Sequence, residues 1–352
     1  MRALVTGASG FIGSNLVDRL LAEGVSVKCL VRRRSNLSWL QNLPVTLVTG
    51  DFQDPASLAP AVADTDLVFH VAGATRASRR AKYFQGNFEA TRNLLRACED
   101  YGPAEQKFVF ISSLAAAGPS SGSPLTEDQP PRPVSAYGES KLRAEKAVLE
   151  FSQKRPATII RPPAVYGPRD RDTLLLIKSI QRGLHVIPGR VGQKVSLVHV
   201  HDLVAGIWLA ARSDRSQGRI YYICGEGHHD WRTIGAQAGR VLGKRFKTFH
   251  VPWWLMRLVA QGGSLTSQFT STPTLMSLDK LRDLRQRGWL CSNARARSLV
   301  PSTVVGRSSS SSPVIRTNSG RGRKSNNPGS ERQPSSASTS PSVATTCGLM
   351  MQ

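Results

Sequence analysis

Tyr137 and Lys141 stand four positions apart in the segment SAYGESKLRAEKA. Residues at this spacing share one face of a helix, so the phenol and the ammonium could lie side by side. A phenol has a pKa of about 10 and is a poor base at neutral pH, but a neighbouring cation favours its ionised form. Such a phenol can exchange a proton with a substrate oxygen. The alternative is a solvent-facing pair on a surface helix.

A serine at the end of an apolar run supplies a second polar group. Ser113 closes the segment FVFISS, which is typical of a buried strand. Side chains at the carboxyl end of a parallel strand face the ligand crevice of an open α/β sheet. The helix that carries Tyr137 follows this strand after a loop rich in Gly, Pro and Ser. We therefore consider Ser113, Tyr137 and Lys141 as one candidate catalytic group.

The segment LVTGASGFIG lies between an apolar strand pattern and an amphipathic helical pattern near the start of the chain. Gly7 permits a tight turn, Gly10 lets the backbone approach a pyrophosphate, and Gly13 lets the helix sit close to the strand. The helix start offers free N–H groups and a positive dipole end to the phosphates. The predicted dinucleotide contacts in this turn are Gly7, Ser9, Gly10, Phe11, Ile12 and Gly13. A glycine-rich turn without a ligand is the alternative.

The end of the second predicted strand indicates which dinucleotide binds. An NAD site usually carries Asp or Glu there, whereas this strand ends CLVRRRS. Arg32 and Arg33 stand where a 2′-phosphate would lie, and a guanidinium can bind phosphate with two hydrogen bonds. NADP(H) is therefore favoured, with NAD(H) and simply solvated arginines as the alternatives. Asp51, followed by Phe52, could accept a hydrogen bond from the adenine amino group or cap the next helix.

Apolar strand patterns alternate with helical patterns through the first half of the chain. This order predicts an α/β fold, a doubly wound parallel-sheet Rossmann fold with right-handed crossovers and a smaller C-terminal substrate lobe. The predicted dinucleotide-binding domain is 1–166, completed by about 195–225, and the substrate lobe is 167–194 and 226–297. Residues 298–352 are rich in serine and lack aromatic residues, so we expect a disordered tail.

The formal net charge of +23 would suit nucleic acid or an anionic membrane. No aromatic-and-basic RNA motif or helix-turn-helix pattern accompanies it, so nucleic-acid binding is not expected. No apolar run approaches the roughly 20 residues needed to cross a bilayer, and no signal peptide is recognised, so a cytoplasmic protein is predicted. The segment VPWWLMRLVA permits peripheral membrane contact, although a substrate pocket or a dimer contact is the favoured interpretation. The five cysteines show no metal-ligand spacing.

The chain resembles the extended branch of the short-chain dehydrogenase/reductase superfamily. The matching segments, which cover nearly all of residues 1–297, are TGASGFIG, GDFQD, FHVAG, FVFISS, YGESK and RPPAVYGP. The resemblance implies that Tyr137 is the general acid/base. It also implies that Lys141 binds the nicotinamide ribose and lowers the tyrosine pKa, and that Ser113, rather than Ser112, hydrogen-bonds the substrate oxygen.

The same resemblance assigns further positions. Pro163 would meet the nicotinamide carboxamide, and Val71, Ala72 and Gly73 would lie near the adenine ribose. The resemblance gives Asn87 and Thr91 packing roles, and gives His70 and His201 architectural ones. It also implies a homodimer.

Three readings of the function remain. The first is a reductase or dehydrogenase acting on a carbonyl or alcohol of a hydrophobic molecule, because VRRRSN resembles dihydroflavonol reductases and 3β-hydroxysteroid dehydrogenases. The second is a nucleotide-sugar epimerase or dehydratase with tightly held NAD. The third is a non-catalytic dinucleotide-binding scaffold, which would be expected to lack the Tyr or the Lys. For the second, the candidate diphosphate ligands are Arg169, Arg171, Lys178 and Arg190.

The C-terminal segment departs from the family pattern. Extended members finish with a lobe-closing segment and a helix, whereas CSNARARSLVP begins that pattern and then gives way to serine-rich sequence. Either the reading frame has shifted near Ser298 or the chain carries a tail of its own. In both cases the last helix of the substrate lobe is expected to be missing, while the catalytic residues are retained.

Overall fold

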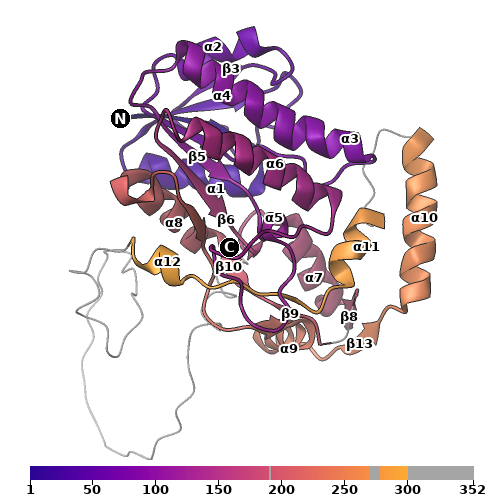
Figure 1. Ribbon diagram of the computed structural model, residues 1–352. Helices are drawn as coiled ribbons and strands as arrows, with labels where there is room; N and C mark the ends of the chain where they lie inside the picture. Colours follow the sequence, from indigo (N-terminus) through magenta and orange to yellow (C-terminus); the bar gives the residue numbers. More distant parts are fainter. Residues whose placement is uncertain (190–191, 270–277, 300–352) are drawn as a thin grey trace, which may run out of the picture. The chain divides into compact units, whose positions relative to one another are not determined.

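Seven parallel strands form the central sheet of the computed structural model, which describes residues 1–189, 192–269 and 278–299 (Figure 1). Their order across the sheet is β11-β6-β5-β4-β1-β2-β3, the arrangement of a doubly wound Rossmann fold. In that order they are β11 Ile220–Tyr222, β6 Ala157–Arg161, β5 Lys107–Ile111, β4 Leu67–His70, β1 Arg2–Thr6, β2 Ser26–Val31 and β3 Val45–Thr49. The predicted fold class is confirmed.

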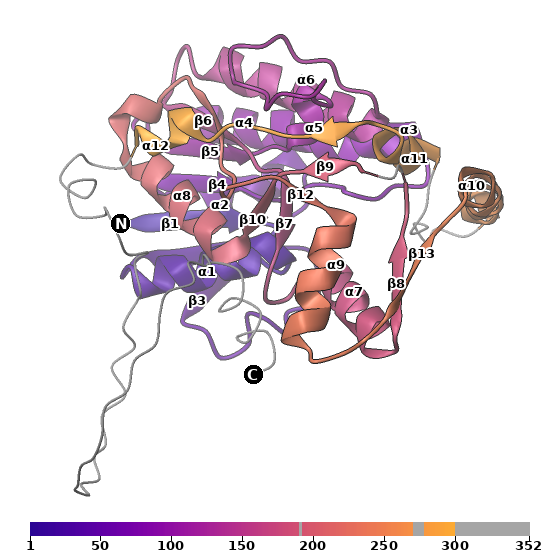
Figure 2. The ribbon, with the colours of Figure 1, turned by 90° about the horizontal axis from the view of Figure 1, so that it is seen from below.

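Helices cover both faces of this sheet, because successive strand residues point to opposite sides. Val5 packs with α1 and α8 on one face, and Leu4 packs with α2, α4 and α6 on the other. Figure 2 shows α6 on one side of the strands and α1 on the other. The helices of this half are α1 Phe11–Ala22, η1 Pro55–Leu58, α2 Ala59–Val62, α3 Arg80–Tyr83, η2 Phe84–Glu89, α4 Ala90–Tyr101, α5 Leu114–Ala117, α6 Ala136–Phe151, α8 Val200–Arg212 and η3 Asp214–Ser216.

The second lobe consists of short strands and helices drawn from separate segments. Its strands form two pairs and one group of three. The pairs are β7 Ala164–Tyr166 with β10 Leu197–His199, and β8 Leu184–Ile187 with β13 Lys247–His250. In the group of three, β9 Lys194–Val195 lies between β12 His229–Asp230 and β14 Gly288–Trp289. Its helices are α7 Arg171–Gln181, α9 Trp231–Val241, α10 Trp253–Phe269, α11 Leu278–Leu284 and α12 Ala294–Arg297.

Two details differ from the sequence-based prediction. The segment PATIIRPPAVYG, whose pattern predicts the sixth strand and its exit, is divided at Pro162 and Pro163, because proline has no N–H to continue a ladder. Its second part, β7, pairs with β10, so the segment VSLVHVH does not return to the central sheet as expected. The boundaries proposed for the two lobes remain predictions, and the tail lies, from residue 300 onward, outside the described residues.

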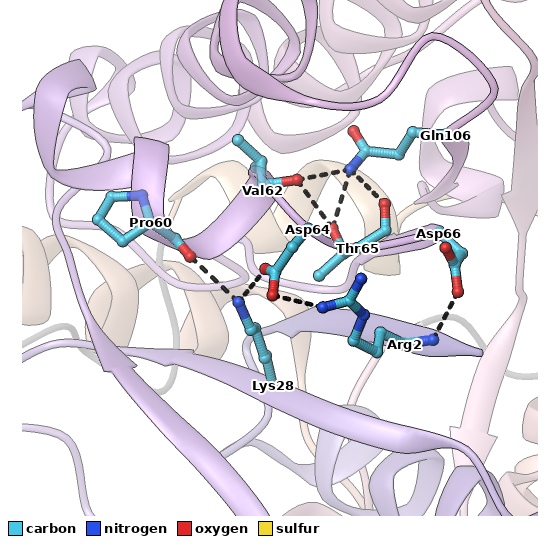
Figure 3. Close-up of polar contacts among 8 residues, drawn as sticks. All are labelled: Arg2, Lys28, Pro60, Val62, Asp64, Thr65, Asp66 and Gln106. Carbon is cyan, nitrogen blue, oxygen red and sulfur yellow. Dashed lines mark hydrogen bonds and ion pairs between the residues drawn. The ribbon is translucent and has the colours of Figure 1, made fainter.

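Polar contacts connect the loops at the amino edge of the sheet (Figure 3). The Arg2 amide donates to Asp66 at 2.7 Å, and the carboxylate of Asp64 pairs with both Arg2 and Lys28. The Gln106 amide donates to the carbonyl oxygens of Val62 and Thr65. These bonds join the loops before β4 and β5 to β1 and β2. In doubly wound sheets, ligands generally bind at the opposite, carboxyl edge of the strands.

The described residues form no helix that is long and apolar enough to cross a membrane. Within the same residues, no group of three metal-ligating side chains gathers. The four described cysteines, Cys29, Cys98, Cys224 and Cys291, are buried thiols, and Cys347 lies outside the described residues.

Candidate active site

Tyr137 is the second residue of α6, at the carboxyl edge of the sheet. Ser135 caps this helix by accepting a hydrogen bond from the Gly138 N–H at 3.3 Å. The carboxylate of Asp279, from α11, accepts hydrogen bonds from the N–H groups of Ala136 at 2.7 Å and Tyr137 at 3.3 Å. Two groups from distant parts of the chain therefore hold the first turn of α6 and the backbone of Tyr137.

The side chains of Ser113 and Tyr137 are joined by a hydrogen bond. Ser113 lies just after β5 and caps α5, where its Oγ accepts from the Ala115 N–H at 3.1 Å. The neighbouring Ser112 turns the other way and donates to the buried carboxylate of Glu145 at 2.5 Å. Of the two serines in FVFISS, only Ser113 therefore faces the tyrosine.

Burial raises the pKa of Tyr137 to about 12. The Ser113 hydrogen bond lowers this pKa, while the nearby Asp283 and Tyr83 raise it. The Tyr83 ring centroid lies 6.0 Å from that of Tyr137. The phenol is therefore protonated at neutral pH in the protein alone, which suits proton donation to a substrate oxygen.

Lys141 lies one helical turn along α6 and is only 3% exposed. Its Nζ donates to the carbonyl oxygen of Ile111 at 2.9 Å and sits 4.9 Å from the ring centroid of Phe110. Burial lowers the pKa of Lys141 to about 8, and the negative charge of Glu145 opposes this shift. A Cβ on Gly73 would lie 3.0 Å from this Nζ, so the glycine leaves room for the ammonium.

Glu145 continues the same helix face by one more turn. It forms a buried ion pair with Arg161 of β6 at 2.6 Å, with side chains that are 1% and 3% exposed. Arg161 also reaches the hydroxyl of Tyr222 at 3.2 Å. The row Tyr137, Lys141 and Glu145 thus runs from the carboxyl edge of the sheet into the core, with a carboxylate behind the ammonium.

The glycine turn has the geometry expected of a dinucleotide cradle. Gly7 adopts φ +69°, and a Cβ there would lie 2.7 Å from the amide nitrogen of Ala72. A Cβ on Gly13 would lie 2.1 Å from the carbonyl oxygen of Gly7. Gly10 is exposed at the start of α1, and no side chain among the described residues caps that helix end. The N–H groups at the helix start, next to Ser9, Phe11 and Ile12, are therefore open to a phosphate.

A relay of hydrogen bonds connects this turn with the helix that precedes β5. The Ala72 N–H donates to Thr6 Oγ1 at 3.2 Å, and Thr6 bonds His70 Nδ1 at 2.7 Å. His70 Nε2 bonds Thr91 Oγ1 at 3.0 Å, and Thr91 donates to the Asn87 carbonyl. Burial lowers the pKa of His70 to about 3, so its imidazole is neutral. Both ring nitrogens are occupied, which fits an architectural role.

Asn87 connects the relay with the tyrosine helix. Its Oδ1 accepts from the Ala74 N–H at 2.7 Å, and its Nδ2 donates to Ser140 Oγ at 2.8 Å. Ser140 in turn donates to the carbonyl oxygen of Tyr137 at 2.7 Å. The loop of Val71, Ala72 and Gly73 therefore lies between the glycine turn, which contacts Ala72, and Lys141, which contacts Gly73.

Arg32 and Arg33 follow β2 with exposed side chains. The Arg32 N–H donates to Ser35 Oγ at 3.0 Å. In residues 1–189, 192–269 and 278–299, neither guanidinium forms an ion pair with a carboxylate. Both side chains therefore remain available to an anionic group beyond the end of β2.

Asp51 and Phe52 lie just beyond β3. Asp51 accepts a hydrogen bond from the Gln53 N–H at 3.0 Å and so shapes its own loop. It does not cap the following helix, whose N-cap is Asp54. The Phe52 ring meets the edge of His70 at 5.5 Å between centroids. Pro163 sits between β6 and β7, next to the Pro162 carbonyl that accepts from the Leu114 N–H at 2.8 Å.

Comparison with known proteins identifies the family to which this chain belongs. The model of the NAD dependent epimerase/dehydratase family matches residues 3–224. The chain belongs to this family. A ceramide reductase from Caulobacter vibrioides is 30% identical over 302 residues, which cover 85% of this chain and 88% of that protein.

Two further similar proteins are named for sugar-linked molecules. The N-acetyl-alpha-D-glucosaminyl-diphospho-ditrans,octacis-undecaprenol 4-epimerase of Escherichia coli O157:H7 is 28% identical, covering 76% of this chain and 80% of that protein. The solved structure of MoeE5 in complex with UDP-glucose and NAD has a TM-score of 0.66 and 26% identity, covering 85% of this chain and 91% of that one. The resemblance to the extended short-chain dehydrogenase/reductases is confirmed, and this family member is an enzyme of that type.

Of the four residues predicted to bind a diphosphate, Arg169 is held by contacts within the protein. Arg169, at φ +74°, pairs with Asp18 at 2.8 Å and lies over the Trp39 ring at 5.0 Å. It is thereby engaged with the first helix and the loop after β2. Arg171 and Lys178 lie on α7, and Arg190 is outside the described residues.

Sequence reasoning missed the two acids of α11 in this family member. Asp279 and Asp283 stand one helical turn apart and both reach the start of α6, Asp283 through the side chain of Ser135. Burial raises the pKa of Asp283, and its Oδ1 has no hydrogen-bond partner among the described residues. The only available signal was the spacing in LDKLRDL, which gives no hint of a partner more than a hundred residues away.

Proposed function

We propose that this enzyme is an NADP(H)-dependent reductase or dehydrogenase acting on a carbonyl or alcohol of a hydrophobic molecule. The observation that carries the proposal is the end of β2, where Val31 is followed by Arg32 and Arg33. An NAD site usually places a carboxylate there to bind the ribose 2′-hydroxyl. Two exposed guanidinium groups without acidic partners in the described residues instead suit a 2′-phosphate.

The residues of the site account for the proton transfer. In the direction of reduction, Tyr137 donates its phenolic proton to the substrate oxygen, and Ser113 hydrogen-bonds that oxygen. Lys141, one turn away, stabilises the phenolate that remains, because the positive charge favours the ionised form. A bound nicotinamide would supply the hydride, or accept it in the reverse reaction. The phenolate then regains a proton from solvent, so one carbonyl takes up one hydride and one proton.

The fit of a dinucleotide rests on the glycine turn. The turn comes so close to the loop of Ala72 that only glycine fits at Gly7. In the part of the chain that the structure describes, the exposed start of α1 has no side-chain cap. The neighbouring loop reaches Lys141 at Gly73. The residues proposed to bind the phosphates and those proposed to contact the nicotinamide therefore lie on adjacent segments. Phe11, Ile12, Val71, Ala72 and Pro163 are the proposed wall of this site, with Asp51 and Phe52 at its adenine end.

A hydrophobic substrate is supported by the relatives. One is named for ceramide and another for an undecaprenol-linked sugar, and both molecules carry long apolar chains. The epimerase reading is favoured by the NAD-bound relative and by the 4-epimerase. It is weakened because Arg169, one of its candidate diphosphate ligands, is engaged by Asp18 and Trp39.

Native mass spectrometry of the purified full chain, with each dinucleotide added separately, tests the proposal. We expect an exchangeable complex with NADPH that forms at lower concentration than the complex with NADH. NAD that is retained from the host through purification would overturn the proposal in favour of an epimerase. The same spectra give the oligomeric mass, which tests the homodimer that we propose from the family resemblance.

A further inference from the structure

Helix α10 carries apolar side chains on two opposite faces. Trp253, Met256 and Ala260 pack into a small core with α11. On the other side, four apolar side chains remain exposed, at 64% for Trp254, 39% for Leu255, 56% for Leu258 and 55% for Val259. Positions 254, 255, 258 and 259 form one stripe on a helix. We name this stripe the outer face of α10.

Helix α11 connects α10 with the candidate active site. Met256 and Ala260 pack against Leu281 and Leu284 of α11. Helix α11 in turn holds the first turn of α6 through Asp279. Both views show α10 next to α11, at the margin of the second lobe (Figures 1 and 2). One helix, α11, therefore lies between α10 and the helix of Tyr137.

The segment around α10 is strongly basic. Residues 241–299 contain ten lysines and arginines, among them Arg257 on α10 itself, and only two acids. Arg282 pairs with Asp279 at 3.9 Å, and Arg295 and Arg297 pair with Asp128 and Glu226. The positive charge of this surface therefore rests on the other seven basic residues of the segment. A second copy of this chain would present the same positive charge, so electrostatics disfavour pairing of two such faces. An anionic lipid surface complements both the charge and the apolar stripe.

We propose that the outer face of α10 binds the surface of an anionic lipid bilayer, with Trp254 at the level of the lipid headgroups. Helix α10 lies in the interface in this arrangement and does not cross the bilayer. The proposed function gives the docking a purpose, because an amphiphilic substrate can pass from the bilayer to the neighbouring site. The docking itself depends only on α10 and on the basic residues around it.

Co-sedimentation of the full chain with lipid vesicles tests the docking. Binding is expected to vesicles of phosphatidylcholine with phosphatidylglycerol and to fall steeply with added salt, and phosphatidylcholine alone should bind far less. Replacing Trp254→Ser and Leu258→Ser together should weaken binding by roughly tenfold or more, because two apolar anchors are lost. The matched control replaces two exposed apolar residues of the other lobe, Leu47→Ser and Tyr101→Ser, and should bind like the wild type.

Two further measurements distinguish insertion of the outer face into the bilayer from adsorption by charge alone and from dimerisation. Quenching of tryptophan fluorescence by brominated lipid should fall in Trp254→Phe and persist in Trp39→Phe. Equal vesicle binding by the double variant and the wild type would show adsorption by charge alone and overturn the proposal. A wild-type dimer that the double variant converts to a monomer would identify a second copy as the occupant. NADPH binding by the same variants should be unchanged. Vesicle binding therefore tests the docking, and NADPH binding tests the proposed function, so that either can fail without the other.

Discussion

Glu145 and Arg161 form an ion pair at 2.6 Å in which both side chains are almost entirely removed from solvent. Breaking a buried pair leaves an uncompensated charge in the core, which costs more than the pair itself contributes. The pair has a second consequence here, because Glu145 lies one turn from Lys141 and its charge keeps the Lys141 pKa from falling further. The Glu145 carboxylate therefore affects both the stability of the fold and the pKa of Lys141.

Glu145→Gln is expected to lower the free energy of unfolding by about 3 kcal/mol, because Arg161 keeps its charge and loses its counter-ion. Activity that requires the Lys141 ammonium falls as pH rises through the Lys141 pKa, which is about 8 in the native protein. Without the carboxylate this pKa drops, so the decline in kcat/KM should begin at lower pH. Urea unfolding and a pH–rate profile measure the two effects.

The matched control is Glu139→Gln on the same helix, where the carboxylate pairs with Arg80 at the exposed surface. Its unfolding free energy should change by at most about 1 kcal/mol, and the pH–rate profile should stay in place. A Glu145→Gln enzyme with the pH profile of the wild type would mean that this carboxylate does not tune the lysine.

Tyr137→Phe removes the proposed acid and keeps the ring in its place. Turnover is expected to fall about a thousandfold or more, while NADPH still binds, because the dinucleotide is held by the glycine turn. Fluorescence titration and steady-state rates measure the two properties. Tyr101→Phe, at the exposed end of α4, is the control. Substantial turnover in Tyr137→Phe would contradict the proposed mechanism.

Removal of the buried phenol should also change the alkaline stability. The folded-state pKa of Tyr137 is raised to about 12, so the folded protein keeps this proton while the unfolded chain loses it near pH 10. The wild type should lose stability as pH rises from about 10 towards 12, and Tyr137→Phe should lose less. Unfolding curves at several alkaline pH values compare the two proteins.

Arg32→Ala tests the choice of dinucleotide. The affinity for NADPH should fall roughly tenfold or more, because a charge-assisted hydrogen bond to the 2′-phosphate is lost, while the affinity for NADH changes little. Arg34→Ala, two positions further along, is the control for general charge loss. If the ratio of the NADPH and NADH affinities stays the same in Arg32→Ala, the arginine does not bind the 2′-phosphate.

Two glycines of one turn should respond differently to the same substitution. A Cβ on Gly13 would lie 2.1 Å from the Gly7 carbonyl oxygen, so Gly13→Ala should push α1 from β1 and destabilise the fold by about 2 kcal/mol. A Cβ on Gly10 would meet that oxygen only at 3.2 Å. We expect the added methyl group to compete with the phosphate that is proposed to bind at the start of α1. Gly10→Ala should therefore fold and lose dinucleotide affinity. Thermal melting and dinucleotide titration of both variants compare these effects.

Local patterns were sufficient to predict the sheet, the glycine turn and the row of Tyr137 and Lys141, because strand alternation and helical spacing are short-range properties. They could not predict that β10 pairs with β7, because a three-residue strand does not specify its partner. Asp279 lies more than a hundred residues from Tyr137 in the sequence, and only the tertiary fold brings its carboxylate to α6. The choice of Ser113 over Ser112 came from family resemblance. The structure gives it a physical basis in the opposite directions of the two hydroxyls.

The carboxylate of Asp279 also limits how this enzyme can be recombined with its relatives. A chimera that kept the nucleotide-binding half and took its second lobe from another family member would import a new partner for the first turn of α6. Even with every proposed catalytic side chain retained, the tyrosine would then stand on a differently anchored helix. Exchange of specificity between such enzymes should succeed only when the donor lobe brings an acid to the same two amides.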